Sequence, residues 1–365
     1  MAPKPKKSGG VTIVDIAREL GVSHATVSRV LNSREGVKAV TRQRVLDAVD
    51  RLGYIANPQA RRLAGGRSRV IGLIVSGLTN GYANLLLEGI ETALSETDYD
   101  LLLYSSVSRS RRQIHESGYV DRLMNGLADG LIIISPFFPE PYLDRLERHH
   151  FPYVLVDHSD QRGSRPVISA TNFQGAYDAT DYLIQLGHQR IAFISGWQVH
   201  PSTHERLEGY KAALTTHGLD FDPALIREGD YLIEGGYQAA LELFALPQPP
   251  TAIFASSDDM AIGVMKAGRQ LGLRIPEDIS IMGFDDIVQA SLVYPTLTTV
   301  SQSLYQTGET ALNMLLSYIE NPQLPRQQQV IATQLMIRNS CQAPPATNGR
   351  VPNFPIQTSV TGPNR

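Results

Sequence analysis

The sequence predicts an α/β protein in which a small all-helical head precedes a large core of two doubly wound parallel lobes. Residues 12–53 show apolar residues at helical spacing in three short segments. From Val70 onward, apolar runs of strand length alternate with helical stretches, which is typical of parallel sheets covered by helices on both faces. About ten such units are too many for one compact sheet, so the core is predicted to have two lobes.

The head is predicted to contain a helix-turn-helix followed by a third helix. Thr12 is placed to cap the first helix, with Asp15 at capping-box spacing, and Gly21 ends that helix. Ser23 is placed to cap the second helix and Thr41 the third. The expected helices are residues 12–20, 23–31 and 41–52.

The segments on either side of the head are predicted to depend on partners. Residues 1–10 are expected to be a disordered basic arm, and residues 11–56 to form the helix-turn-helix domain. A hinge helix opens at Asn57-Pro58 within the linker 57–69, because Asn is a favoured N-cap and Pro fits the first helical position. This helix is too short to be stable alone in water, so either DNA or the same segment of a second copy must order it.

The core is predicted to span residues 70–340. Its strands are short apolar runs, and its helices are longer stretches with apolar residues at helical spacing. The expected strands are 70–76, 101–104, 131–135, 153–156, 191–195, 252–255 and 279–284. The expected helices lie near 84–94, 118–125, 175–186, 205–217, 236–244, 259–271 and 304–319.

Cysteine content and the chain ends narrow the class of protein. The one cysteine, Cys341, rules out a disulfide framework or a cysteine-rich metal site within one chain. Residues 341–365 are rich in Pro, Asn, Gly and Thr and are predicted to be disordered, without the leucine heptads of a coiled coil. No long apolar segment follows the N-terminus, so neither a signal peptide nor a membrane span is expected, and the protein is predicted to be cytoplasmic.

Charge is divided unevenly along the chain, although the formal net charge is only −3. Residues 1–69 contain 4 Lys and 10 Arg against 5 acidic residues, whereas the remainder contains 19 basic and 31 acidic residues. A basic head on an acidic body predicts a nucleic-acid surface at one end. On composition alone, a basic tag or a merely solvated face remains the alternative.

Motifs in the head and the core follow one another in a recognisable order along residues 11–340. The head has TIVDIA at 12–17, GVSHATVSRVLN at 21–32 and LGYIANP at 52–58, and the core has LGHQRIA at 186–192 and SIMGFDD at 280–286. Together these motifs resemble the lactose/galactose repressor family (LacI/GalR) of transcriptional regulators.

The resemblance implies a core like that of periplasmic sugar-binding proteins, with an effector bound between two lobes that crossover strands join. Lobe one would comprise about 70–170 and 301–329. Lobe two would comprise about 171–300 and 330–340.

The resemblance also implies which head residues contact DNA. The second helix would enter the major groove, with His24 and Ala25 as the main base readers and Arg29 one turn further along. A phosphate contact remains the alternative for His24. Leu63 would wedge between base steps from the minor groove, unless it packs only against its dimer mate. The full implied set is Thr12, Ser23, His24, Ala25, Thr26, Ser28, Arg29, Asn32, Tyr54, Asn57, Ala60 and Leu63.

For the effector site, the resemblance implies a set of polar and aromatic residues between the lobes. Arg206 with Asp157 and Asp285, which follow predicted strands, suits the hydroxyls of a sugar. Either aspartate is alternatively a turn cap. Tyr82 and Trp197 are candidates for stacking on a sugar ring, with ordinary packing as the alternative. The full implied set is Ser76, Asn80, Tyr82, Asp157, Trp197, Arg206, Tyr231, Ser257, Asp285 and Leu304.

Two positions depart from the family pattern and leave the identity of the ligand open. Ser257 stands where several relatives carry Asn, and Leu304 stands where some carry an aromatic residue. The neighbouring Asp258 is interpreted as the cap of the helix that follows. No cofactor, no metal and no membrane partner is expected beyond the effector, which is predicted to be a carbohydrate.

Other functional classes fit parts of the sequence less well. A sugar-binding transport protein fits the core, but the basic head and the expected absence of a signal peptide argue against it. An enzyme is disfavoured because the sequence contains no G-x-S-x-G, no G-x-x-x-x-G-K-[ST] and no H-E-x-x-H. The pair His149-His150 is interpreted as a solvated helix end rather than a metal site.

The sequence therefore predicts a repressor that binds a pseudo-palindromic operator as a homodimer. Effector binding between the lobes would change their relative angle and lower the affinity for DNA. A corepressor of opposite sign and a partner phosphoprotein remain alternatives, because each would act on the same two states.

Overall fold

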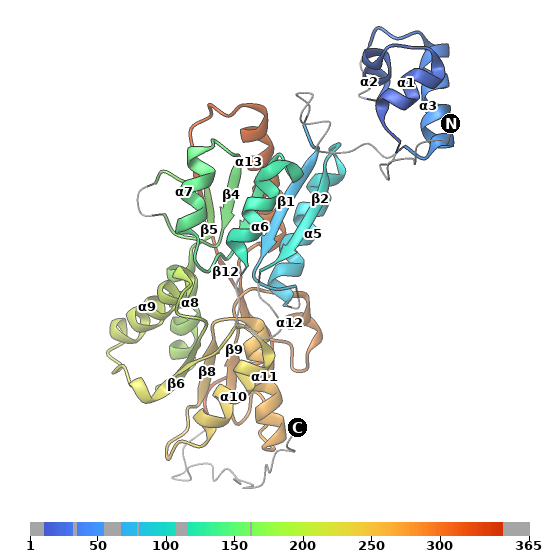
Figure 1. The fold of residues 1–365 in the computed structure, drawn as a ribbon. Coiled ribbons are helices and arrows are strands. Elements are labelled where there is room, and N and C mark those ends of the chain that lie inside the picture. Colours follow the sequence, from blue (N-terminus) through green and yellow to red (C-terminus); the bar gives the residue numbers. More distant parts are fainter. Residues whose placement is uncertain are drawn as a thin grey trace, which may run out of the picture. The chain divides into compact units, whose positions relative to one another are not determined.

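Two compact units make up the chain, Met1–Ser68 and Arg69–Arg365. The first is a helical head and the second an α/β core (Figure 1). The computed structural model describes residues 11–31, 35–54, 67–78, 80–106, 115–160 and 163–345. The predicted basic arm and hinge helix lie outside the described residues.

The head contains three helices: α1 (Ile13–Leu20), α2 (His24–Leu31) and α3 (Ala39–Leu52). The predicted capping box is present, because the Thr12 hydroxyl accepts from the Asp15 N–H and the Asp15 carboxylate accepts from the Thr12 N–H at 3.0 Å. Gly21 and Gly53 end α1 and α3 with φ of +66° and +61°. Glycine suits both positions because a side chain disfavours the left-handed conformation.

The third helix begins earlier than the sequence predicts. Lys38 is its N-cap and makes no side-chain cap bond, so the expected cap at Thr41 was wrong. Gly36, with φ of +94°, turns the chain shortly before α3 and allows the earlier start. The buried core of the head consists of Ile16, Ala17, Val27, Val30, Val45 and Ala48.

Lobe one is built on a six-stranded sheet with the order β11-β5-β4-β3-β1-β2, and every neighbouring pair is parallel. The central strands β1, β3 and β4 are almost fully buried, so helices must cover both faces of the sheet there. The strands are β1 (Val70–Val75), β2 (Asp100–Ser105), β3 (Gly130–Ile134), β4 (Tyr153–Val156), β5 (Val167–Ala170) and β11 (Gln328–Ile331).

Successive side chains of β1 point to opposite faces of this sheet, as the period of a strand requires. Leu73 packs with α5 (Gly81–Ser95) and α13 (Leu304–Glu320). Ile74 packs on the other side with α6 (Glu116–Arg122), a wide turn at Leu123–Leu127, and α7 (Glu140–Arg148). The helices therefore enclose the sheet on both faces (Figure 1).

Lobe two repeats this plan on a four-stranded parallel sheet with the order β7-β6-β8-β9. Phe193 packs with α8 (Asn172–Gln185) and α9 (Pro201–Thr216), and Ile194 packs with α10 (Ile233–Phe244) and α11 (Asp258–Gln270). The strands are β6 (Ile191–Ser195), β7 (Ile226–Glu228), β8 (Ala252–Ala255) and β9 (Ser280–Met282). The short helix α12 (Val288–Leu292) follows β9. The predicted α/β fold class is confirmed.

Within residues 163–345 the chain passes between the lobes three times. It passes from β5 into α8, from β10 (Thr299–Ser301) into α13, and from β11 into β12 (Gln334–Met336). Strands β10 and β12 pair antiparallel, and the hydroxyls of Thr171 and Thr333 lie 2.8 Å apart. Hydrogen bonds therefore tie the crossing segments to one another.

The end of the core extends further than the sequence predicts. Gln342 is held on lobe two by hydrogen bonds, so the expectation of disorder from Cys341 onward was wrong at this residue. The Gln342 carbonyl accepts from His188 Nε2 at 2.9 Å and from the Ser280 hydroxyl at 3.0 Å. Buried polar groups need such partners, which hold this segment on lobe two.

Candidate functional site

The exposed face of α2 is the first candidate site. Val27 and Val30 are buried in the head core, whereas His24, Ala25 and Arg29 are exposed. A helix that reads a DNA groove needs one apolar face for its own domain and one accessible face for base edges. The three implied base readers are accessible on this helix.

Several other residues of the implied DNA-contacting set also make hydrogen bonds inside the head. The Ser23 hydroxyl accepts from the Thr26 N–H at 3.0 Å, and the Thr12 hydroxyl donates to the Asp15 carboxylate at 2.6 Å. The bonds from Thr12 hold the pKa of Asp15 below its usual value. Ser28 and Tyr54 are half-buried. Asn32, Asn57, Ala60 and Leu63 lie outside the described residues.

The second candidate site is a cavity of about 330 Å³ between the two lobes of the core. It lies at the carboxyl ends of both parallel sheets, where open α/β sheets bind their ligands. Lobe one contributes Ser76, Ser105, Ser135 and Asp157 from the ends of β1 to β4. Lobe two contributes Trp197, Asp230, Ser257 and Asp285 from positions just after β6 to β9.

Nine of the ten implied effector residues line this cavity: Ser76, Asn80, Tyr82, Asp157, Trp197, Arg206, Tyr231, Ser257 and Asp285. Leu304 does not line it. It is the first residue of α13, is 4% exposed, and packs in the core of lobe one. Its assignment to the effector site was wrong, because an apolar residue on a helix that covers a sheet is drawn into the core.

Arg206 is fixed in the wall of the cavity and is 2% exposed. Its Nε donates to Asn172 Oδ1 at 2.9 Å, and its Nη1 donates to the Ser256 carbonyl at 2.6 Å. The guanidinium lies over the Phe284 ring, 3.8 Å from the ring centre. These contacts set the orientation of the guanidinium before a ligand arrives, which lowers the entropic cost of binding.

Asp285 lies beside this guanidinium, with 3.7 Å between its Oδ1 and Arg206 Nη1. The same oxygen accepts from Gln302 Nε2 at 2.6 Å. Burial raises the pKa of Asp285, and the positive charge of Arg206 opposes that rise. The pair can together donate to and accept from neighbouring hydroxyls of a polyol.

Asp157 provides the corresponding carboxylate from lobe one. Its Oδ2 accepts from the hydroxyls of Ser135 at 2.9 Å and Ser202 at 3.3 Å. Four residues of the cavity have positive φ angles: Ser135 (+46°), Asp157 (+56°), Tyr231 (+61°) and Asp285 (+128°). Strained backbone of this kind gathers at functional sites, where the surrounding structure holds side chains in place.

Aromatic rings from both lobes meet at the cavity. The Phe137 ring of lobe one lies 5.0 Å from the Trp197 ring and 4.9 Å from the His200 ring of lobe two, measured between centres. His200 is 3% exposed and burial lowers its pKa, so its imidazole is neutral near pH 7. The Tyr231 hydroxyl bonds to the Thr203 hydroxyl at 2.6 Å.

A separate polar contact also joins the lobes. Asp259 Oδ2 of lobe two accepts from the Gly81 N–H of lobe one at 3.0 Å. A Cβ added to Gly81 would lie 2.7 Å from Ile287 Cδ1, so the two lobes touch closely here. This hydrogen bond and the aromatic contact both join the two lobes.

Two residues of the cavity also cap helices. Asn80 Oδ1 accepts from the Ala83 N–H at 2.9 Å, and the Ser257 hydroxyl accepts from the Met260 N–H at 3.2 Å. The interpretation of Asp258 as the cap was wrong. Asp258 is fully buried, and burial raises its pKa to about 7.

Sequence reasoning missed several residues that line the cavity: Ser105, Ser135, His200, Ser202, Asp230 and Asp259. Ser105 and Ser135 follow or end strands that the sequence predicts, so the position at a strand end is a signal for both. His200 and Ser202 have no such signal, because only the placement of α9 brings them to the cavity.

Within the described residues, no group of three or more His, Cys, Asp or Glu side chains is arranged to hold a metal ion. A search of the same residues finds no helix with the length and apolar character needed to span a membrane.

A helix-turn-helix head followed by a two-lobed core, with a cavity between the lobes that charged and aromatic side chains line, defines a ligand-responsive DNA-binding regulator. The comparisons with known proteins agree with this class. Residues 12–57 match the bacterial regulatory proteins of the lacI family, and residues 180–341 match the periplasmic binding protein-like domain. The chain belongs to the LacI family of transcriptional regulators.

Relatives cover nearly the whole chain. Catabolite control protein A of Priestia megaterium is 36% identical over 85% of this chain and 92% of its own length. The lac repressor dimer bound to operator and the anti-inducer ONPF superposes with a TM-score of 0.77, at 30% identity over 92% of this chain and all of that chain. The complex of the regulator CelR with cellobiose gives a TM-score of 0.68, at 30% identity over 90% of this chain and 99% of that chain.

Proposed function

We propose that the protein is a repressor that binds an operator as a homodimer and is controlled by a small carbohydrate in the interlobe cavity. One observation carries the proposal: Arg206 and Asp285 from lobe two and Asp157 from lobe one line the same cavity between the lobes. Fixed charged groups with aromatic neighbours suit a polar, ring-shaped ligand. The family membership and the solved relatives support binding rather than catalysis as the role of this cavity.

In this proposal, the head, residues 11–56, reads DNA through α2. His24, Ala25 and Arg29 supply the exposed side chains, and the excess of basic residues in the head attracts the phosphate backbone. One head reads only one half of a pseudo-palindrome, so operator binding requires two copies. The lac repressor relative is bound to its operator as a dimer, which supports this arrangement. Binding to chromosomal DNA would place the protein in the cytoplasm.

A ligand in the cavity controls DNA affinity because it contacts both lobes. A ligand that binds one arrangement of the lobes more tightly shifts the population toward that arrangement. The linker 57–69 leads directly into β1 of lobe one, so lobe one is covalently coupled to the head. Ligand binding in the cavity and operator binding by the head are then linked by a coupling free energy.

Fluorescence anisotropy with labelled DNA from upstream of the chain's own gene tests this proposal. The titration is repeated at one fixed salt concentration with a panel of neutral sugars, because phosphate contacts make the affinity strongly salt-dependent. We expect tight binding that one sugar releases. His24→Ala serves as a control, because it should weaken DNA binding while leaving the response to that sugar intact.

Other outcomes select between the remaining alternatives. A sugar that strengthens DNA binding would make it a corepressor. Weak binding that a phosphoprotein restores would move control to a protein partner. Absence of specific DNA binding under every condition would refute the proposed function.

A further inference from the structure

A buried carboxylate outside the cavity holds the loop that follows β3. Glu116, at the start of α6, is 3% exposed. Its Oε1 accepts from the Phe137 N–H at 3.1 Å, and its Oε2 accepts from the Tyr142 hydroxyl at 3.1 Å. The Ser106 hydroxyl also donates to Oε1, at 3.4 Å. Three donors from separate segments of lobe one therefore converge on one side chain.

This carboxylate is costly to keep where it is. Burial raises the pKa of Glu116, because the charged form loses its hydration. Burial also raises the pKa of Tyr142, so its hydroxyl stays protonated and donates to Glu116. Without the carboxylate, the buried donors would lose their acceptor, and each unpaired donor carries its own desolvation cost. The arrangement is consistent with a requirement for precise placement of this loop.

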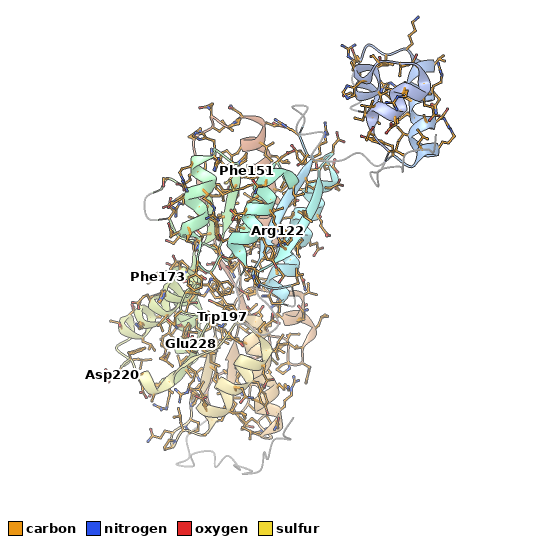
Figure 2. All side chains as sticks on the ribbon, viewed as in Figure 1. Arg122, Phe151, Phe173, Trp197, Asp220 and Glu228 are labelled. Carbon is orange, nitrogen blue, oxygen red and sulfur yellow. The ribbon has the colours of Figure 1, made fainter. Side chains whose placement is uncertain are left out.

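Phe137 is the residue that the loop carries to the other lobe. It is 8% exposed, and its ring contacts the rings of Trp197 and His200. Trp197 and His200 both line the cavity, and they come from the segment between β6 and α9 of lobe two. Figure 2 labels Trp197, which lies where lobe two faces lobe one. Phe137 is thus the contribution of lobe one to an aromatic contact across the cleft.

We propose that Glu116 is a positioning residue of the effector cavity, acting through Phe137. Glu116 fixes the backbone of Phe137, and the Phe137 ring supports Trp197 and His200. This contact contributes to the free energy of closing the lobes around a ligand. The inference rests on the proposed function only in its prediction for effector affinity, since the contact itself exists without a ligand.

The rival explanation is that Glu116 only stabilises the core of lobe one. Loss of a purely structural residue in lobe one would leave the environment of Trp197 in lobe two unchanged. Trp197 is the only tryptophan of the chain, so the intrinsic fluorescence of the full-length protein reports this contact directly. Acrylamide quenching measures the accessibility of its ring without any ligand.

Four variants make the test specific. Glu116→Ala removes the acceptor, and we expect the quenching constant of Trp197 to rise about twofold as its ring becomes more accessible. Phe137→Ala removes the ring and should give the same change. Glu116→Gln keeps one carbonyl oxygen for the Phe137 N–H and should stay near wild type. Glu147→Ala is the control for a lobe-one carboxylate away from the cavity, because Glu147 accepts from the Tyr153 hydroxyl at 3.1 Å and from Arg165 Nε at 2.8 Å, at the opposite end of β4 from Asp157.

Effector affinity supplies the second readout. With a sugar that the anisotropy assay identifies, Glu116→Ala should bind about tenfold more weakly, since one aromatic contact is worth about one tenfold step. Folding of each variant is checked by circular dichroism and thermal unfolding. Unchanged quenching of Trp197 in folded Glu116→Ala overturns the proposal, and so does an equal change in Glu147→Ala.

The test remains decisive if one variant or one assay fails. Should Glu116→Ala not fold, unchanged quenching in Phe137→Ala overturns the proposal, and increased quenching in Phe137→Ala with near-wild-type Glu116→Gln supports it. Should no sugar affect DNA binding, the proposed function fails, whereas the fluorescence comparison still decides whether Glu116 positions the contact.

Discussion

The charged side chains that the two lobes contribute to the cavity differ in where their hydrogen-bond partners lie. In lobe two, Arg206 donates to Asn172 and to the Ser256 carbonyl, so its position does not depend on lobe one. In lobe one, Asp157 draws one of its two side-chain bonds from Ser202 of lobe two. Arg206 is therefore preorganised by lobe two alone, whereas Asp157 gains one of its two side-chain bonds only when the lobes are close together.

Of the substitutions that test this difference between the lobes, removal of Arg206 should lower effector affinity the most. Arg206→Ala takes away the fixed donor and leaves Asp285 buried without its counter-charge, so we expect effector affinity to fall by at least about 100-fold. Isothermal titration calorimetry with the responsive sugar measures the loss. Operator binding by the ligand-free variant should persist, because the head is a separate unit.

Arg206→Lys is the control that keeps the positive charge but loses the planar geometry of the guanidinium. Lysine keeps the positive charge beside Asp285 but cannot reproduce the planar fork that bonds Asn172 and the Ser256 carbonyl together. An affinity close to wild type in Arg206→Lys would show that the preorganised guanidinium geometry of Arg206 does not contribute to effector binding.

Asp157→Asn should have a smaller effect, because one of the two side-chain bonds of Asp157 forms only when the lobes are close together. Asparagine preserves the shape and one acceptor oxygen but loses the charge that strengthens bonds to ligand hydroxyls. We expect effector affinity to fall about tenfold, the usual cost of one charge-assisted bond. The same calorimetric titration checks it, and a loss as large as that of Arg206→Ala would abolish the distinction between the lobes.

Much of this architecture could be predicted from the sequence because local and global signals agree. The Thr12–Asp15 capping box and Gly53 mark helix ends through their own hydrogen bonds and backbone freedom. Buried parallel strands such as β6 appear as continuous apolar runs. Strand ends then indicate where polar residues of the cavity belong.

The strands and side-chain roles that the sequence did not predict depend on contacts between distant parts of the chain. Strand β11 has three exposed residues and β7 has only three residues, so neither forms an apolar run. Asp258 looks like a helix cap, yet it is buried and accepts from the Thr299 hydroxyl at 2.5 Å and from the Ile287 N–H at 2.9 Å. His200 reaches the cavity only through the placement of α9, and no local pattern encodes that.

Gly81→Ala should lower effector affinity less than Asp157→Asn does, because it disturbs the contact between the lobes and not the bonds to the ligand. The added Cβ would lie 2.7 Å from Ile287 Cδ1, so closure must shift and effector affinity should fall about threefold. Gly118→Ala is the matched control, because a Cβ there meets nothing within 4 Å. Equal affinities in the two variants would show that the lobes do not close at Gly81.

The smallest effects should be changes in the pH dependence of stability, which two buried titratable groups, one in each lobe, alter in opposite directions. Burial lowers the pKa of His188 in lobe two and raises the pKa of Glu116 in lobe one. The stability that neutral His188 contributes is complete above its ordinary pKa of about 6.5 and is lost as the pH falls through the folded pKa. The contribution of protonated Glu116 is complete below about 4.5 and is lost as the pH rises through its folded pKa.

Thermal unfolding of His188→Gln and Glu116→Gln across pH 4.5 to 7.5 separates the two contributions, because neither variant titrates at the substituted position. The midpoint difference between wild type and His188→Gln should shrink as the pH falls below about 6.5, by roughly 2–4 °C for each kcal/mol lost. The difference between wild type and Glu116→Gln should shrink as the pH rises above about 4.5. If the midpoint of each variant stayed at a constant distance from that of wild type across this pH range, the protonation of His188 and Glu116 would make no contribution to stability.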